Sequence, residues 1–256
     1  MNLEAAQLAI LVLLGLAVGS FLNVCIHRLP RGQSLNSPPS RCPSCDDRLR
    51  WFDNIPVLSY VLLGGRCRTC RAGISIRYPL VELITMALFV IHGEGFGWSA
   101  LLIPRLVFAC AMVVLFAIDL EHQLLPNVIT LPGIAVGLIA SAVLPPGLVD
   151  ALIGVLIGGG VLWLIGEAYF RYSGHEGMGG GDVKMLAMIG AFLGWKLVLV
   201  TLVLSSIAGS LIGLAVIAFR KGGMKYALPY GTFLALGALV ASLAGDAIVN
   251  WYVGLY

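Results

Sequence analysis

The chain has 256 residues, of which 59% are hydrophobic and only 11% are charged. Because soluble domains carry roughly 25% charged residues, this composition excludes an ordinary soluble globular protein. The net charge of +3 is small, and nothing in the chain suggests a nucleic-acid partner. We therefore expect the lipid bilayer to surround most of the protein.

Apolar runs that could cross a hydrocarbon core of roughly 30 Å recur almost to the end of the chain. The first run, Ala5 to about Ile26, lacks the positive region and the cleavage site of a signal peptide, so we expect a retained helix. Eight runs are predicted to span the membrane, although the second and sixth are short: 5–26, 79–93, 98–118, 126–144, 148–169, 183–194, 197–219 and 228–251. The expected fold class is an all-α polytopic membrane protein with about eight transmembrane helices.

The placement of the 16 basic residues predicts the orientation of these spans. Nine are arginines between Arg28 and Arg77. Five more fall in loops or span ends on the same side of an eight-span bundle: Arg171, Lys184, Arg220, Lys221 and Lys225. Because basic loops stay in the cytoplasm, we expect this side to be cytoplasmic and both termini to lie outside. Lys196 falls on the opposite side, and Arg105 lies within the third span.

A polar insert from about Arg28 to Tyr78 separates the first two spans and contains four of the six cysteines. They form two C-x-x-C pairs, Cys42-Pro-Ser-Cys45 and Cys67-Arg-Thr-Cys70. Four thiolates complete a tetrahedral shell around Zn²⁺ with no open position, so we expect a structural zinc site. The ion would supply folding energy that so small an insert cannot obtain from a hydrophobic core. The alternative is disulfides or a redox pair, and a reducing compartment argues against disulfides.

Two aspartates are predicted to lie at span ends on the cytoplasmic side. Asp119 ends one apolar run and precedes Pro126, which opens the next helix. Asp182 follows the glycine run Gly177-Met-Gly-Gly-Gly181 and opens another helix. Acidic residues beside membrane spans are costly and usually functional. The glycines would let an extended substrate strand approach closely. The alternative is that the run is a flexible loop and that Asp182 only caps its helix.

Two facing aspartates cannot easily both ionise, so one holds a proton and the pair can act as acid and base in a peptidase. A zinc peptidase motif is excluded because His175-Glu-Gly-Met-Gly179 lacks the second histidine. A serine mechanism lacks a histidine near Ser205 and Ser206. A transporter remains an alternative, but it favours acids near the bilayer midplane. A zinc-binding membrane adaptor would leave the glycine and aspartate element without a function.

Several motifs together resemble the type IV prepilin peptidases with N-methyltransferase activity, a family of aspartic peptidases. In the family's order and at about its spacing, the chain carries Gly19-Ser-Phe-Leu-Asn-Val24, both C-x-x-C pairs, Arg77-Tyr-Pro-Leu-Val-Glu82, Asp119-Leu-Glu-His-Gln-Leu-Leu-Pro126 and Gly179-Gly-Gly-Asp182. The family often repeats the aspartate after the proline, where this chain has Asn127. The match covers nearly the whole chain.

The resemblance implies removal of the short basic leader of type IV prepilins and type II secretion pseudopilins at the cytoplasmic face of the bacterial inner membrane. It then implies methylation of the new N-terminus with S-adenosylmethionine. Asp119 and Asp182 would be the catalytic pair, with Gly179, Gly181 and Lys184 as a supporting loop. The four cysteines would bind zinc. A peptidase that lacks the methyltransferase activity is a further alternative.

These inferences divide the chain into three parts. Residues 1–26 form the first transmembrane helix, residues 27–78 the cytoplasmic zinc-binding insert and methyltransferase region, and residues 79–256 the transmembrane aspartic peptidase bundle. No nucleotide-binding glycine motif marks the S-adenosylmethionine site. Glu82, an acid at a span end facing the insert, is a candidate for a contact with this cofactor. The alternative for Glu82 is a structural pair with an arginine of the insert.

Overall fold

The structure, a computed structural model, describes residues 4–175, 179–219 and 229–255. Among these residues the regular structure is helical apart from two isolated β-bridges in the insert, which confirms the predicted all-α class. The chain forms two compact units, Met1–Leu102 and Ile103–Tyr256. This boundary lies one helix beyond the division that we expected at residue 79.

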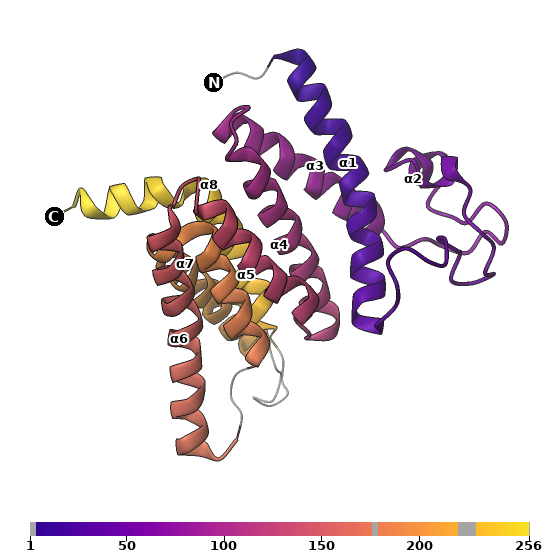
Figure 1. Cartoon of the computed structure of the whole chain (residues 1–256). Helices are drawn as coiled ribbons and strands as arrows, with labels where there is room; N and C mark the ends of the chain where they lie inside the picture. The colour runs from indigo at the N-terminus through magenta and orange to yellow at the C-terminus, as the bar shows by residue number, and fades with distance from the viewer. Residues whose placement is uncertain (1–3, 176–178, 220–228, 256) are drawn as a thin grey trace. The chain divides into compact units, whose positions relative to one another are not determined.

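The first unit is a pair of long helices with the insert between them in sequence. Its elements are α1 (Ala5–Arg28), η1 (Leu29–Arg31), η2 (Trp51–Asn54), α2 (Leu58–Leu62) and α3 (Arg77–Phe96) (Figure 1). Helices α1 and α3 pack together, and two glycines of α1 allow a close approach. A Cβ added at Gly15 would lie 2.6 Å from the Met86 Cα, and one at Gly19 would lie 2.7 Å from the Glu82 Cα. Small residues of this kind bring membrane helices close enough for tight van der Waals packing.

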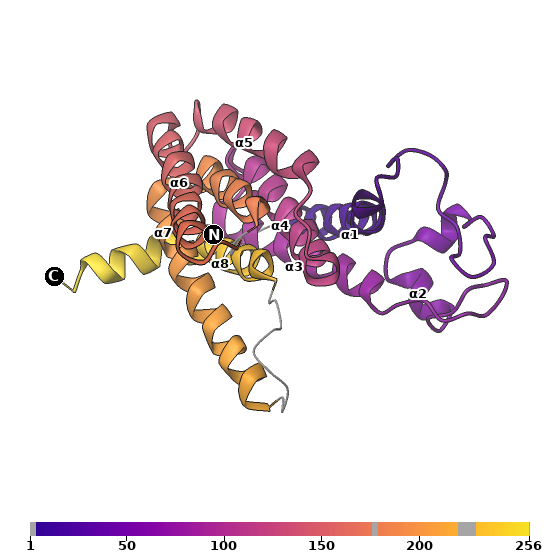
Figure 2. The same ribbon diagram turned by 90° about the horizontal axis from the view of Figure 1, so that it is seen from below.

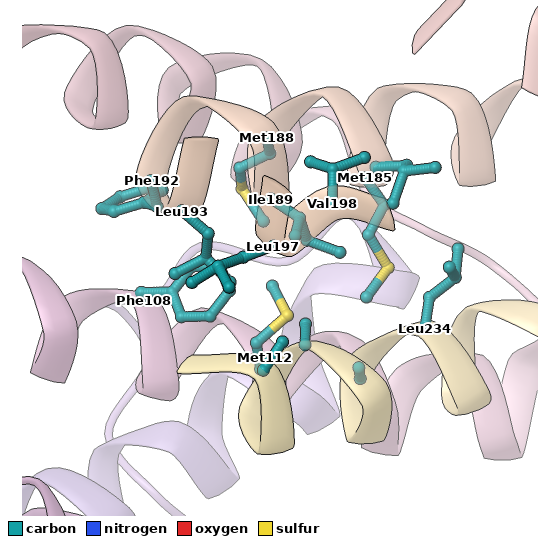
Figure 3. Packing of buried hydrophobic residues seen from close by; sticks show 14 of the residues in the cluster. Phe108, Met112, Met185, Met188, Ile189, Phe192, Leu193, Leu197, Val198 and Leu234 are labelled. Atoms are coloured by element: carbon teal, nitrogen blue, oxygen red, sulfur yellow. The ribbon is translucent and has the colours of Figure 1, made fainter. Parts of the chain in front are cut away.

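The second unit is a bundle of five helices. They are α4 (Leu102–His122), α5 (Asn127–Ser141), α6 (Leu148–Ser173), α7 (Gly180–Phe219) and α8 (Tyr230–Val253). Helix α7 packs against α5, α6 and α8. Its side chains Met185, Met188 and Leu197 lie in a buried cluster with Met112 of α4 and Leu234 of α8 (Figure 3). The cluster therefore holds α4, α7 and α8 against one another.

Glycines also permit the contact between α6 and α7, which run alongside each other (Figures 1 and 2). A Cβ added at Gly190 would lie 2.2 Å from the Gly154 carbonyl oxygen, and one at Gly158 would lie 2.5 Å from the Leu186 carbonyl oxygen. Neither backbone oxygen can move aside without moving its helix. These glycines therefore set the separation of α6 and α7.

Each of the eight predicted runs overlaps a helical segment of the structure, although the boundaries shift by a few residues and the count of spans is approximate. Within the described residues, six helices are long and apolar enough to cross a membrane, and the 15-residue α5 is shorter. The expected runs 183–194 and 197–219 are the two helical segments of α7, which meet at a kink at Gly194, where φ is 78° and ψ is 172°. A single glycine with positive φ redirects the chain without ending the apolar pattern. The helices fit a multi-pass membrane protein.

Replacing Gly158 with alanine should lower the melting temperature of the protein in detergent, because the new methyl group collides with backbone. Such overpacking typically costs about 1–3 kcal/mol. The matched control is Gly160→Ala on the same helix, since a Cβ at Gly160 would have nothing within 4 Å. Alanine should be neutral or slightly stabilising there. Equal melting temperatures for the two variants would contradict the close packing of α6 on α7.

Candidate active site and metal centre

Asp119 lies near the end of α4 and is only 5% exposed. Its Oδ2 atom accepts hydrogen bonds from the Thr232 backbone N–H at 2.7 Å and from the Thr232 hydroxyl at 3.1 Å. Thr232 is in the first turn of α8, where free N–H groups favour a nearby negative charge. A buried carboxylate is costly unless it is hydrogen-bonded. The start of α8 therefore holds one oxygen of Asp119 in place.

Asp182 lies in the first turn of α7 and is half-buried. Its N–H donates to the Gly179 carbonyl oxygen at 3.1 Å, and a backbone hydrogen bond from Gly179 reaches its carboxyl group. The structure brings Asp182 near enough to Asp119 for their carboxyl groups to interact electrostatically. Two acids that are 63 positions apart in sequence (182 minus 119) thus meet at helix ends.

Leu125 fills the space between these helix ends. A Cβ added at Gly181 would lie 2.9 Å from the Leu125 Cβ, and one at Gly231 would lie 2.9 Å from the Leu125 Cδ1 and from the Asp119 Oδ2. Neither glycine can carry a side chain without moving Leu125 or Asp119. The two glycines are therefore required for the convergence of the loop after α4 with the starts of α7 and α8.

The supporting residues of the glycine element lie as follows. Gly179 and Gly181 flank the first residue of α7, and the Lys184 ammonium group donates to the Asn127 Oδ1 at 2.9 Å. This bond ties α7 to the start of α5. Gly177 and Met178, which belong to the predicted run, lie outside the described residues.

The sequence analysis missed Thr232 and Gly231. Both are uncharged and lie at the start of an apolar run, so a search for acids, histidines and cysteines passes over them. The available signal was Pro229-Tyr-Gly-Thr232, a helix start with a small residue and a hydroxyl. The predicted span count placed this start on the same side as the two aspartates, where a buried carboxylate needs donors.

The four cysteines of the insert converge as their spacing predicts. Their Sγ atoms all lie within 4.8 Å of one another, and those of Cys42 and Cys70 are 3.8 Å apart. Four sulfurs at about 2.3 Å from one zinc ion in a tetrahedron would be separated by about 3.8 Å, whereas a disulfide bond measures about 2.05 Å. The geometry therefore fits four ligands of one zinc ion.

The two C-x-x-C pairs have the same backbone geometry. The Cys42 N–H donates to the Asp47 carbonyl oxygen at 2.9 Å, and the Cys67 N–H donates to the Ala72 carbonyl oxygen at 2.8 Å. The residue after each second cysteine has a positive φ, 56° at Asp46 and 60° at Arg71. Each pair is thus a tight turn that presents two thiols to the same point.

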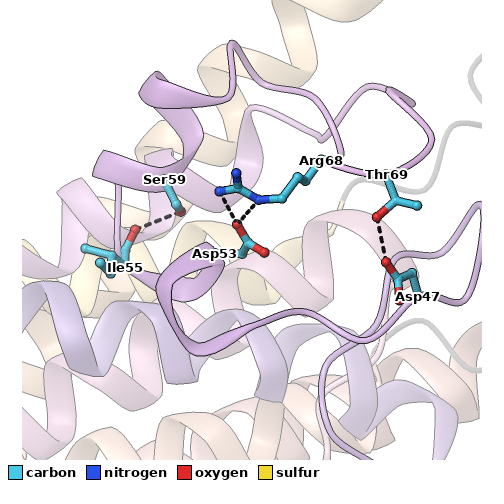
Figure 4. A network of polar contacts seen from close by, with 6 residues as sticks. All are labelled: Asp47, Asp53, Ile55, Ser59, Arg68 and Thr69. Carbon is cyan, nitrogen blue, oxygen red and sulfur yellow. Dashed lines mark hydrogen bonds and ion pairs between the residues drawn. The ribbon is translucent and has the colours of Figure 1, made fainter.

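Polar contacts connect the turns to the rest of the insert (Figure 4). The Thr69 hydroxyl donates to Asp47 at 2.5 Å and so joins one turn to the other. The Arg68 guanidinium pairs with Asp53 at 2.7 Å. A backbone hydrogen bond from Ser44 is the main cause that lowers the pKa of the Cys42 thiol, to about 7.

Glu82 of α3 is buried beside the insert. Its Oε2 accepts a hydrogen bond from the Val57 backbone N–H at 2.7 Å, and the Ser20 side chain is near enough to interact with its carboxyl group. These partners come from the insert and from α1. The structure therefore places Glu82 where the insert meets the two helices of its unit.

Comparison with known proteins finds two family models that match this chain. Residues 13–94 match the family model of the bacterial peptidase A24 N-terminal domain, and residues 106–214 match that of the type IV leader peptidase family. The two matched segments fall within the two compact units. No solved structure matches the chain significantly.

Several relatives match over nearly their full length. A Pseudomonas aeruginosa protein named prepilin leader peptidase/N-methyltransferase is 39% identical, over 94% of this chain and 92% of its own. A protein of the same name from Aeromonas salmonicida is 38% identical, over 96% of this chain and 93% of its own. With both family models and these relatives in agreement, the chain belongs to the type IV leader peptidase family.

Proposed function

We propose that this protein removes the leader peptide of prepilins and pseudopilins and then methylates the new N-terminus, with Asp119 and Asp182 as the catalytic pair. The relatives are named for both activities. The observation that carries the assignment is the convergence of two acids at the ends of membrane helices, one of them buried and held by Thr232. A transporter would need such acids near the bilayer midplane instead.

The hydrogen bonds suggest different roles for the two carboxyl groups. The Asp119 Oδ2 accepts two hydrogen bonds from Thr232, which favour a negative charge, so we assign the ionised state to Asp119 and leave its Oδ1 to accept a proton from water. Asp182 then carries the shared proton. The water oxygen attacks the scissile carbonyl carbon as its proton passes to Asp119, while Asp182 protonates the carbonyl oxygen.

Collapse of the resulting gem-diol completes the hydrolysis. Asp119 gives its proton to the leaving nitrogen as the C–N bond breaks, and Asp182 recovers a proton from a hydroxyl group of the gem-diol. No covalent intermediate forms, and both carboxyl groups return to their starting states.

The chemistry would take place at the cytoplasmic face of a bacterial inner membrane. The nine arginines of Arg28 to Arg77 support this orientation, because basic loops stay in the cytoplasm. The apolar helix of a prepilin could then lie against the bundle in the lipid while its basic leader reaches the aspartates.

The metal and the methyl donor would act with the first unit. Cys42, Cys45, Cys67 and Cys70 would hold a structural Zn²⁺ ion that stabilises the insert. S-adenosylmethionine would supply the methyl group. The insert is the polar, non-membrane part of this unit, so we assign methyl transfer to it.

Replacing either aspartate with asparagine should abolish leader cleavage, because asparagine cannot exchange the proton. We expect rates about 10²–10⁴-fold lower for Asp119→Asn and Asp182→Asn. Gel analysis of a purified prepilin incubated with each variant measures the rate, and membrane extraction checks insertion. Cleavage at the normal rate by either inserted variant would rule out the pair.

Replacing Gly231 with alanine should lower the cleavage rate at least about tenfold, because the added Cβ displaces the Asp119 carboxylate. Gly180→Ala is the matched control at the start of α7, since a Cβ there would have nothing within 4 Å. It should cleave at nearly the wild-type rate. The same prepilin assay measures both variants, and equal rates would show that the close approach of α8 to Asp119 is unimportant.

The double variant Cys42→Ser, Cys45→Ser should lose its zinc, because two of the four thiolate ligands are removed. The insert should then become sensitive to trypsin at its arginines. Elemental analysis of the purified protein should find about one zinc ion per wild-type chain and almost none in the variant. Cys25→Ser, which changes a cysteine outside the cluster, is the control. Unchanged zinc in the double variant would refute the four-thiolate site.

A further inference from the structure

We propose that Glu82 is a positioning residue that anchors the zinc-binding insert to the α1 and α3 helix pair, and that methyl transfer depends on this anchor while leader cleavage does not. The proposal rests on the assignment of methyl transfer to the insert. It gives Glu82 a role other than contact with the methyl donor.

The central contact joins a membrane helix to the insert. The Glu82 side chain is buried in α3, with 7% exposure, and its Oε2 accepts the Val57 N–H at 2.7 Å. Val57 immediately precedes α2. Loss of the carboxylate would leave this N–H, at the start of α2, without its acceptor.

Val57 has a backbone conformation that needs such support. Its φ is 58° and its ψ is −47°, which is a strained conformation for a β-branched residue. Strained residues persist only where the surrounding structure holds them. The adjacent Leu58 N–H donates to the Pro56 carbonyl oxygen at 2.5 Å, so the chain turns sharply here. Glu82 therefore holds the turn from which α2 begins.

The other side of the anchor is α1. Gly19 lets α1 come so close that an added Cβ would lie 2.7 Å from the Glu82 Cα, and the neighbouring Ser20 side chain is near enough to interact with the Glu82 carboxyl group. One turn further along, the Asn23 amide donates to the Tyr78 carbonyl oxygen at 3.0 Å. The anchor thus connects α1, α3 and the insert at one buried point.

From α2 the contacts continue to the second cysteine turn. The Tyr60 hydroxyl donates to the Ile74 carbonyl oxygen at 3.3 Å, and the Gly65 N–H donates to the Tyr60 carbonyl oxygen at 2.9 Å. Gly65 in turn accepts from the Ile74 N–H at 2.7 Å. Gly65 and Ile74 flank the Cys67–Cys70 turn. A change at Glu82 would therefore shift the orientation of the metal site without removing a ligand.

Replacing Glu82 with glutamine should have a different effect if Glu82 is an anchor than if it binds the cofactor. The carbonyl oxygen of a glutamine side chain can still accept the Val57 N–H, so Glu82→Gln should keep most of the anchor. A contact that depends on the negative charge of Glu82 would be lost in both Glu82→Gln and Glu82→Ala. Comparison of the two variants therefore distinguishes the two roles.

The experiment uses the full-length protein purified in detergent with a co-purified prepilin and S-adenosylmethionine. Cleavage and methylation of the same substrate are measured for wild type, Glu82→Gln, Glu82→Ala and the control Glu94→Ala, an exposed acid on the same helix. Glu82→Ala should lower methylation at least about tenfold, and Glu82→Gln should stay within about threefold of wild type. Cleavage and zinc content should be unchanged in all variants.

Hydrogen exchange gives a second readout that does not depend on activity. Amides in the segment 55–63 should lose protection in Glu82→Ala and keep it in Glu82→Gln. Equal loss of methylation in both variants, with a raised KM for S-adenosylmethionine and unchanged protection, would make Glu82 a cofactor ligand and overturn the proposal. Normal protection and normal methylation in Glu82→Ala would also overturn it, as would loss of cleavage.

These experiments distinguish a wrong assignment of methyl transfer to the insert from a wrong role for Glu82. If the double cysteine variant methylates normally, then the insert does not carry methyl transfer, and that part of the proposed function is wrong. The hydrogen-exchange result still decides whether Glu82 holds the segment before α2.

Discussion

The peptidase unit depends on one constraint, which is that the Asp119 carboxylate is buried among membrane helices and must receive hydrogen bonds. Thr232 donates two hydrogen bonds to it, one from its backbone and one from its side chain. The start of α8 must therefore lie against the end of α4, and a side chain at position 231 would displace Asp119 or Leu125. Leu125 and Gly181 then bring the first turn of α7, with Asp182, to the same place. Each of these residues is explained by the need to hold one carboxylate.

The two compact units use similar packing for different chemistry. In the first unit, Gly15 and Gly19 let α1 approach α3, and the same closeness allows Glu82 to reach Val57 of the insert. In the second unit, Gly158 and Gly190 let α6 approach α7, whose first turn carries Asp182. The acids of the proposed peptidase and the cysteines of the proposed methyltransferase region thus belong to separate units.

Sequence reasoning predicted those features of the structure that have a strong local sequence pattern. The C-x-x-C spacing predicted the cysteine cluster, and acids beside apolar runs predicted Asp119 and Asp182. It did not predict the contacts that glycines, hydroxyl groups and backbone N–H groups make. Glu82 accepts a hydrogen bond from the backbone N–H of Val57. Every residue except proline has such a group, so the sequence could not identify this donor and left an arginine of the insert as an alternative partner.

The most direct test asks whether leader cleavage and methylation can be separated. A prepilin is co-expressed with the double variant Cys42→Ser, Cys45→Ser, and its N-terminus is analysed by mass spectrometry. Wild type should produce a pilin that has lost its leader and gained one methyl group. The variant should produce a pilin that has lost its leader and gained none. A methylated product from the zinc-free variant would contradict the assignment of methyl transfer to the insert. An intact leader, with the variant correctly inserted, would contradict the independence of the two units.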